Sequence, residues 1–201
     1  MVNNVHFSPS FCKQLKAKAN IINNGKPEQC FIYELNTTED VDYFKELRKM
    51  PEWSKTGFAD VFNTTLKNKY SCEHLFSMET GSGECLGILE LDDDTVNGEF
   101  QKVEYLETFE PCSYRNLDRD RKYIGQTLMA FAAKSLDEEI NKEGLCIPVA
   151  VYSSVPFYVD KCYFTPSEDE ELEWLFLSKK DFGKLITKNE ENTHGKLELI
   201  G

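Results

Sequence analysis

A cluster of basic side chains stands directly before the segment with the strongest helical pattern. Arg115, Arg119, Arg121 and Lys122 fall within eight residues of a chain whose formal charge is −12, and Gly125 follows in the expected first helical turn. A helix start offers N–H groups without intrahelical partners, glycine lets an anion approach closely, and arginine adds charged donors. This spacing favours a phosphate-binding turn; a solvated basic loop before a helix is the alternative.

The segments that must position this turn alternate between strand and helix signals. Apolar residues recur at every fourth position from Ile124 to Ile140, which predicts a long helix. We expect strands over 30–35, 74–79, 85–91, 101–109, 145–152 and 172–177, and helices over 38–50, 57–69 and 157–161. The order is mixed α and β, in a chain whose 201 residues suit one domain.

The two ends of the chain carry weaker signals. Phe11, Leu15 and Ala19 recur at four-residue spacing, which predicts a short helix closed by the turn signal Asn23-Asn24-Gly25. We therefore divide the chain into an N-terminal extension over 1–29, a domain over 30–187 and a polar tail over 188–201.

Three blocks of sequence stand in an order that resembles the GNAT superfamily of N-acetyltransferases over residues 30 to about 187. They read V-E-Y-L-E-T-F-E-P at 103–111, R-D-R-K-Y-I-G-Q-T-L at 119–128 and F-Y-V-D-K-C-Y-F at 157–164. The family's turn usually reads Q/R-x-x-G-x-G/A, so Tyr123 replaces its first glycine and Asp120 its basic residue. Tyr163 likewise replaces the glycine of the family's F-Y-x-x-K-x-G-F ending.

The resemblance implies a fold and a cosubstrate. The fold would be an α/β (α+β) acyl-CoA N-acyltransferase fold, with a mostly antiparallel sheet, one splayed parallel strand pair and flanking helices. The cosubstrate would be acetyl-CoA, without a metal. Its implied contacts are Thr108, Phe109, Arg119, Arg121, Lys122, Tyr123, Ile124, Gly125, Gln126 and Thr127.

The resemblance also implies catalytic roles for three residues. An amine is mostly protonated at neutral pH, so a carboxylate has to collect its proton, and Glu104 and Glu107 are the candidates. Their odd separation puts them on opposite faces of one strand unless a bulge intervenes. Tyr158 aligns with the family's proton donor to the departing thiolate, and amides around Thr108 would polarise the thioester carbonyl.

Pro148 lies inside an apolar run that otherwise reads as a buried strand. Proline cannot donate to a sheet ladder and is usually excluded from central strands. The splayed strand pair of the GNAT fold would explain it, since the pantetheine arm lies in the gap and no ladder donor is needed there.

Composition limits the partners and the location. The net charge of −12 repels phosphates, which argues against nucleic acid as a partner and favours cationic acceptors such as small amines or peptides.

No apolar window is long enough for a membrane span and the start lacks a signal-peptide pattern, so we expect a cytoplasmic protein without a membrane partner. Seven scattered cysteines and three distant histidines give no zinc signature. A homodimer is left open.

Two alternatives compete with an active acetyltransferase. The degenerate glycine turn would also suit a GNAT-like module that has lost turnover and serves to bind acyl-CoA or a protein partner. Asp93 to Glu104 resembles a calcium loop, but the flanking strands and the Asn97-Gly98 hairpin signal make a hairpin the better interpretation.

Overall fold

The computed structural model describes residues 13–35, 74–92, 99–108, 120–137, 141–148, 152–168 and 174–200. Phe109 and Arg119, the two helices expected over 38–50 and 57–69, and the Asn97-Gly98 turn lie outside these residues. The elements in chain order are β1 (Gln14–Asn23), β2 (Lys26–Glu34), β3 (His74–Thr80), β4 (Cys85–Asp92), β5 (Phe100–Thr108), β6 (Arg121–Lys122), α3 (Ile124–Asp137), β7 (Gly144–Pro148), α4 (Val155–Cys162), β8 (Thr165–Pro166), β9 (Trp174–Ser178), α5 (Phe182–Thr193) and β10 (Glu198–Leu199).

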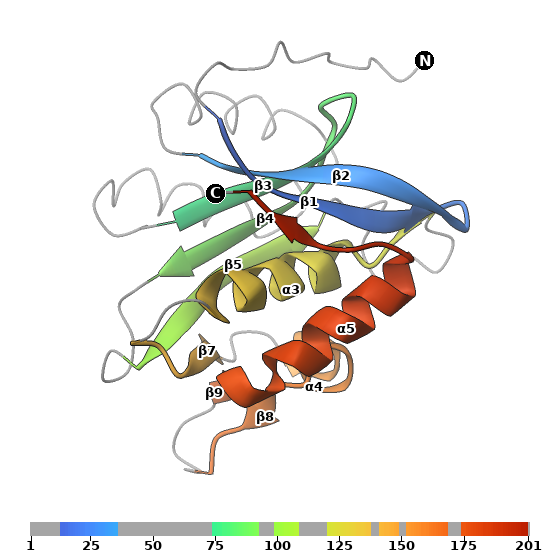
Figure 1. Ribbon diagram of the computed structural model, residues 1–201. Coiled ribbons are helices and arrows are strands. Elements are labelled where there is room, and N and C mark those ends of the chain that lie inside the picture. Colours follow the sequence, from blue (N-terminus) through green and yellow to red (C-terminus); the bar gives the residue numbers. More distant parts are fainter. Residues whose placement is uncertain are drawn as a thin grey trace.

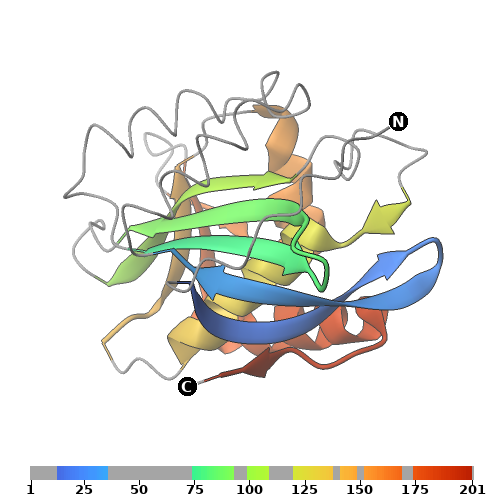
Figure 2. The same cartoon turned by 90° about the horizontal axis from the view of Figure 1, so that it is seen from above.

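The strands of the described segments form one sheet in the order β10-β1-β2-β3-β4-β5-β7-β9-β8, with β6 paired to β1. Helices α3 and α5 cover one face of it (Figure 1), and the strands lie in front of both helices when the molecule is viewed from above (Figure 2). Within these segments β5 and β7 are the parallel pair, and the other pairings are antiparallel. This confirms the expected mixed sheet.

The parallel pair separates soon after it begins. β5 and β7 pair at three positions, the last being Lys102 with Cys146, whereas β5 continues to Thr108. Pro148 pairs with Trp174 of β9 on the other side, so its missing N–H falls beyond the last position paired with β5. The splayed pair expected from the resemblance is therefore present.

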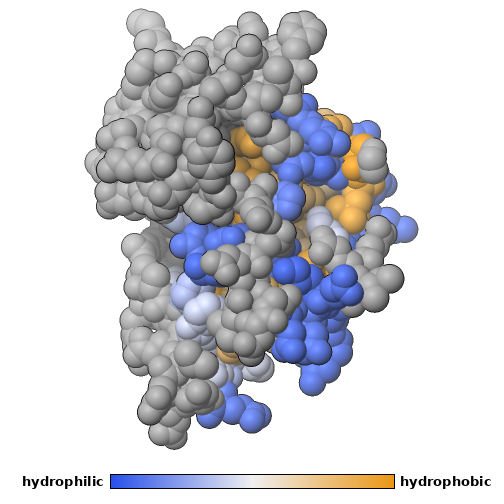
Figure 3. All heavy atoms as spheres, turned by 90° about the vertical axis from the view of Figure 1, so that its left-hand side faces the viewer, coloured by the Kyte–Doolittle hydropathy of each residue, from blue (hydrophilic) through white to orange (hydrophobic). Residues whose placement is uncertain are grey.

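The core lies between the sheet and α3. This helix buries Ile124, Leu128, Ala132 and Leu136, the residues whose four-residue spacing predicts it. In the view of Figure 3, small groups of hydrophobic residues lie beside hydrophilic residues at the surface.

The N-terminal helix expected around Leu15 is wrong. Residues 14–23 form β1, in which Ala17, Ala19 and Ile21 are buried at every second position. The period-two pattern outweighs the four-residue spacing because β1 pairs along its length with β2 through the Asn24-Gly25 turn. The two expected domain boundaries fall inside β2 and α5, and β10 pairs with β1; the domain division itself stays a prediction.

A buried carboxylate ties three strands together near one end of the sheet. The Glu34 carboxylate of β2 accepts a hydrogen bond from Lys16 Nζ of β1 at 2.6 Å and lies 2.9 Å from His74 Nδ1 of β3. Burial by itself raises the pKa of Glu34, but these hydrogen bonds outweigh it and lower the pKa below its ordinary value. The carboxylate thus stays ionised inside the protein.

Candidate functional site

The start of α3 presents backbone amides without helical acceptors. The first helical hydrogen bond runs from the Thr127 N–H to the Tyr123 carbonyl oxygen at 2.8 Å. The amides of Ile124, Gly125 and Gln126 precede it and therefore have no i−4 partner in the helix. Together with the positive end of a 14-residue helix, they form a surface that suits a phosphate.

The three sequence blocks that carry the resemblance meet at Gly125. A Cβ added to Gly125 would lie 3.1 Å from Phe157 Cζ of α4 and 3.6 Å from Thr108 Cγ2 of β5. The helix start, the separated end of β5 and α4 are thus in direct contact. Residues far apart in the sequence converge where the parallel strands part, as the resemblance implies.

Gly87 is a positioning residue that the sequence analysis did not single out. A Cβ there would lie 2.9 Å from the Glu107 carbonyl oxygen, 3.0 Å from Ile124 Cγ2 and 3.1 Å from Leu128 Cδ1. The missing side chain lets α3 rest directly on β4 and β5. A lone glycine within a strand pattern is the signal that marks such a close approach.

Both tyrosines that replace family glycines have left-handed backbone conformations. Tyr123, before α3, has a φ of 73°, and Tyr163, which caps α4, has a φ of 64°. This region favours glycine, because a Cβ there crowds the backbone. At both places the backbone thus has a conformation that glycine adopts readily, and it carries a tyrosine there.

The side chains of Gln126 and Thr127 point into the protein. Gln126 Nε2 donates to the Lys161 carbonyl oxygen at 2.7 Å, and Thr127 Oγ1 donates to Asn189 Oδ1 at 2.9 Å. Both residues are buried and join α3 to α4 and α5. The Thr127 N–H already donates to Tyr123, so of these two residues the backbone amide of Gln126 is the group left for a phosphate site.

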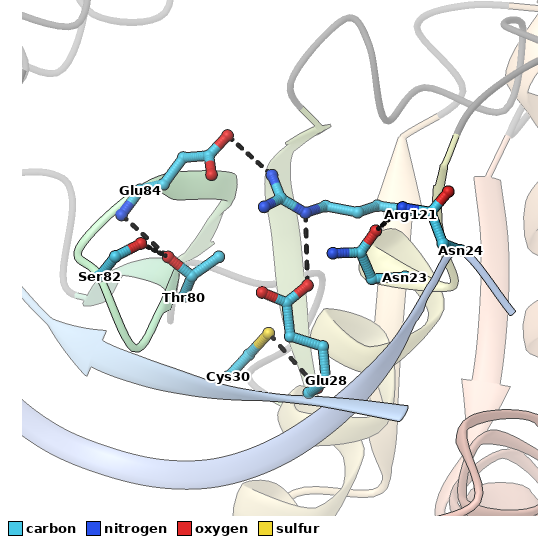
Figure 4. A network of polar contacts seen from close by, with 8 residues as sticks. All are labelled: Asn23, Asn24, Glu28, Cys30, Thr80, Ser82, Glu84 and Arg121. Carbon is cyan, nitrogen blue, oxygen red and sulfur yellow. Dashed lines mark hydrogen bonds and ion pairs between the residues drawn. The ribbon is translucent and has the colours of Figure 1, made fainter. Parts of the chain in front are cut away.

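Arg121 has two carboxylate partners (Figure 4). Its Nη1 donates to Glu84 Oε1 at 2.7 Å, and its Nε lies 3.4 Å from Glu28 Oε2. These contacts tie the turn before α3 to β2 and to the β3–β4 turn. A phosphate would compete with both carboxylates for this guanidinium, whereas the neighbouring Lys122 is exposed; phosphate contacts by either residue stay a prediction.

A bulge interrupts β5 at Glu104. Leu91 of β4 pairs with Val103, but the preceding residue, Glu90, pairs with Tyr105. Glu104 is therefore the extra residue on the bulged strand. Such an insertion shifts the alternation of the side chains that follow.

The bulge places both candidate bases on one face. Val103 and Leu106 both pack toward the core although they are three residues apart. Tyr105 and Glu107 therefore point to the opposite face, where the Tyr105 hydroxyl donates to Glu107 Oε2 at 3.1 Å. Glu104 lies on the same face, since it forms an ion pair with Lys102, which by alternation points away from the Val103 face. The choice between the two glutamates therefore depends on the partners of each.

Glu104 is held by a cation near the point where β5 and β7 part. It forms an ion pair with Lys102, and its side chain is 43% exposed. Burial by itself lowers the pKa of Lys102, but hydrogen bonding and attraction to Glu104 raise it. Lys102 thus stays charged beside Glu104, whereas Glu107 lies further along, next to Thr108 in the separated part of β5.

Tyr158 lies in the middle of α4 among aromatic side chains. Its ring centroid is 5.1 Å from that of Phe157 and 5.8 Å from that of Phe164. Cys162, one turn later, is fully buried, and burial raises the pKa of its thiol, so this neutral side chain anchors the helix. The helix thus holds Tyr158 beside Phe157, the residue that contacts the start of α3; its role as proton donor stays a prediction.

Comparisons with known proteins agree with this geometry at the level of the fold. No protein-family model and no curated protein matches the chain. Among solved structures, AtaTR bound with AcCoA has a TM-score of 0.53 at 18% identity and covers 78% of this chain and 97% of that chain. The chain therefore has the GNAT fold.

Two further solved structures show the same GNAT fold. The AtaT–AtaR complex bound to DNA has a TM-score of 0.53 at 19% identity, and covers 77% of this chain and 97% of that chain. AtaT complexed with acetyl-methionyl-tRNAfMet has a TM-score of 0.51 at 15% identity, and covers 78% of this chain and 98% of that chain. Similarity at this identity establishes the architecture, while the substrate has to be argued from the site.

Neither a metal site nor a membrane-spanning helix is found among the residues that the structure describes. Within those residues, no group of three or more His, Cys, Asp and Glu side chains is arranged to hold a metal ion. No helix in the part of the chain that the structure describes is long and apolar enough to cross a membrane.

Proposed function

We propose that this protein is an N-acetyltransferase that transfers an acetyl group from acetyl-CoA to a primary amine of a small molecule or peptide. The observation that carries the proposal is the meeting of Thr108, Gly125 and Phe157 where β5 and β7 part. A diphosphate would rest on the amides before Thr127, and the pantetheine arm would follow the opening beside β5. The neighbouring structure with bound AcCoA, which has the same fold, supports this placement.

The chain's own residues would divide the chemistry between them. Glu107 would take a proton from the acceptor ammonium, directly or through a water, which leaves the nitrogen lone pair available to attack the thioester carbonyl. Backbone amides near Thr108 would stabilise the oxyanion, because none of the residues described in β7 pairs with β5 there. Tyr158 would donate its phenolic proton to the departing thiolate of coenzyme A.

The acceptor is proposed from charge. A neighbouring structure holds acetyl-methionyl-tRNAfMet, whereas a chain with a net charge of −12 repels a polyanion. The same charge attracts cationic amines. A small amine or a basic peptide therefore suits this protein better than an acceptor carried on RNA.

Binding and turnover are tested in sequence. Acetyl-CoA at roughly 100 times its Kd should stabilise the fold by about 2.7 kcal/mol, a shift of roughly 5–10 °C in a thermal melt. Release of the free thiol with a panel of amines then tests turnover. A melt that does not move rejects acetyl-CoA binding, and a shifted melt without thiol release identifies the alternative, a binding module without turnover.

Variants at Tyr158 and Glu107 test the assigned roles. Tyr158→Phe and Glu107→Gln should each lower turnover by roughly 100-fold or more while the acetyl-CoA melt shift persists. Tyr163→Phe, at the end of the same helix as Tyr158, is the matched control and should leave turnover unchanged. Unchanged turnover in Tyr158→Phe would remove this tyrosine as the acid.

A further inference from the structure

Resting on the proposed function, we propose that Tyr105 is a positioning residue that holds the carboxylate of Glu107 in the orientation a general base requires. Its hydroxyl donates to Glu107 Oε2 at 3.1 Å. The two residues are two positions apart on β5, beyond the bulge at Glu104, and therefore share the face turned away from α3. Without the bulge, strict alternation would put Tyr105 and Glu107 on the same face as Val103.

The register with β4 fixes this pair from the other side. Tyr105 lies opposite Glu90, and Glu107 lies opposite Ile88. Ile88 is almost completely buried, at 1% exposure, and provides an apolar neighbour against which the Glu107 stem can be held. The neighbouring strand thus limits the motion of the Tyr105 ring. Through its hydrogen bond, the hydroxyl in turn restricts the Glu107 side chain, which has three rotatable bonds.

The hydroxyl of Tyr105 remains a donor throughout the reaction. Burial first, and then the nearby charges of Glu107 and Glu90, raise the pKa of this phenol far above its ordinary value. A phenol that keeps its proton donates to a carboxylate and does not compete for the proton of the acceptor. The proton that leaves the ammonium nitrogen forms its new O–H bond at the Glu107 carboxylate, and the electron pair of the broken N–H bond stays on nitrogen.

Other charged groups on this face define the electrostatic setting. Glu90 of β4 faces Tyr105, and Glu79 of β3 lies on the same face with Lys13 Nζ at 2.5 Å. On β5 itself, Glu104 is paired with Lys102. Lys13 compensates the charge of Glu79, whereas Glu90 disfavours further negative charge, so a hydrogen bond from Tyr105 favours the ionised form of Glu107 against Glu90.

The test is the pH dependence of kcat/KM in Tyr105→Phe. Loss of one donor to the ionised carboxylate should move the acidic limb of the profile to higher pH by roughly 0.5–1 unit. Above that limb, the loss of orientation should lower kcat roughly three- to tenfold, with little change in KM for acetyl-CoA. Tyr33→Phe is the matched control, because Tyr33 lies on β2, with β3 and β4 between it and β5, and its ring lies beside Lys13.

A double variant separates positioning from a general effect on folding. If Tyr105 acts through Glu107, adding Tyr105→Phe to Glu107→Gln should lower turnover no further than Glu107→Gln does. Additive losses would show that Tyr105 acts by another route and would overturn the inference. So would an unchanged acidic limb in an active Tyr105→Phe protein.

A readout without turnover keeps this inference distinct from the proposed function. Carboxyl carbon resonances of Glu107, identified by their absence in Glu107→Gln, should titrate at higher pH in Tyr105→Phe than in the wild type. If the wild type releases no thiol with any amine, the proposed function fails, and the titration still reports whether Tyr105 holds the carboxylate. Identical titrations in both proteins would refute the contact itself.

Discussion

Gly87→Ala should weaken both the fold and the candidate site, because Gly87 lies where three elements touch. The added Cβ would lie 2.9 Å from the Glu107 carbonyl oxygen on β5 and within 3.1 Å of both Ile124 and Leu128 on α3. The oxygen belongs to the backbone of the paired strand and has no rotamer through which it can yield. Either the β4–β5 ladder opens locally or α3 moves outward at its first turns.

The size of the effect follows from that crowding. An extra methyl group in a well-packed core costs about 1–3 kcal/mol, and for a chain of this length each kcal/mol lowers Tm by roughly 2–4 °C. We therefore expect Tm to fall by roughly 2–12 °C. Because α3 also carries the amides proposed to bind phosphate, the melt shift produced by acetyl-CoA should shrink as well.

Thermal melts with and without acetyl-CoA measure both effects. Gly81→Ala is the matched control, since a Cβ there would meet one side-chain atom of Phe31 at an ordinary 3.8 Å. That variant should melt within about 2 °C of the wild type, since surface substitutions usually change stability by no more than about 0.5 kcal/mol. A Gly87→Ala protein with wild-type Tm and a full acetyl-CoA shift would refute the close approach of α3 to β4.

Three further substitutions test the start of α3 and the buried carboxylate. Tyr123→Gly should raise the free energy of unfolding, measured in urea, by about 0.5–1 kcal/mol. The substitution removes the cost of a left-handed φ, about 1–2 kcal/mol for an L-residue, but part of this gain is lost because glycine gives up more chain entropy on folding. A decrease in the free energy of unfolding would contradict strain at Tyr123. Gly125→Ala should weaken acetyl-CoA binding severalfold by calorimetry, whereas Gly183→Ala in α5, with no atom within 4 Å of its Cβ, should bind normally. Glu34→Gln should cost about 1–2 kcal/mol at pH 7, and this difference should disappear as the pH falls from 4.5 through the lowered pKa, where wild-type Glu34 takes up a proton. Persistence of the full difference under acid conditions would exclude the ion pairs as its source.

Local patterns were enough to predict α3 but not β1, where a four-residue spacing predicted a helix. The four-residue spacing after Ile124 is that of a helix packed by one face, whereas the splayed strand pair was implied by the resemblance to the GNAT superfamily. The resemblance marked Tyr123 and Tyr163 as replacements of family glycines, and the structure gives both a left-handed φ. Such signals depend on a few successive dihedral angles, which the local residues control.

The partners of individual side chains were decided only by the tertiary structure. The sequence predicts that Arg121 is a phosphate ligand, but in the folded protein its guanidinium contacts Glu28 and Glu84. The bulge at Glu104 determines which face the following residues of β5 occupy, and it depends on the register in which β5 pairs with β4. The sequence of β5 alone does not specify that register. Side-chain contacts across a sheet depend on residues tens of positions away, and the packing of the whole chain selects among them.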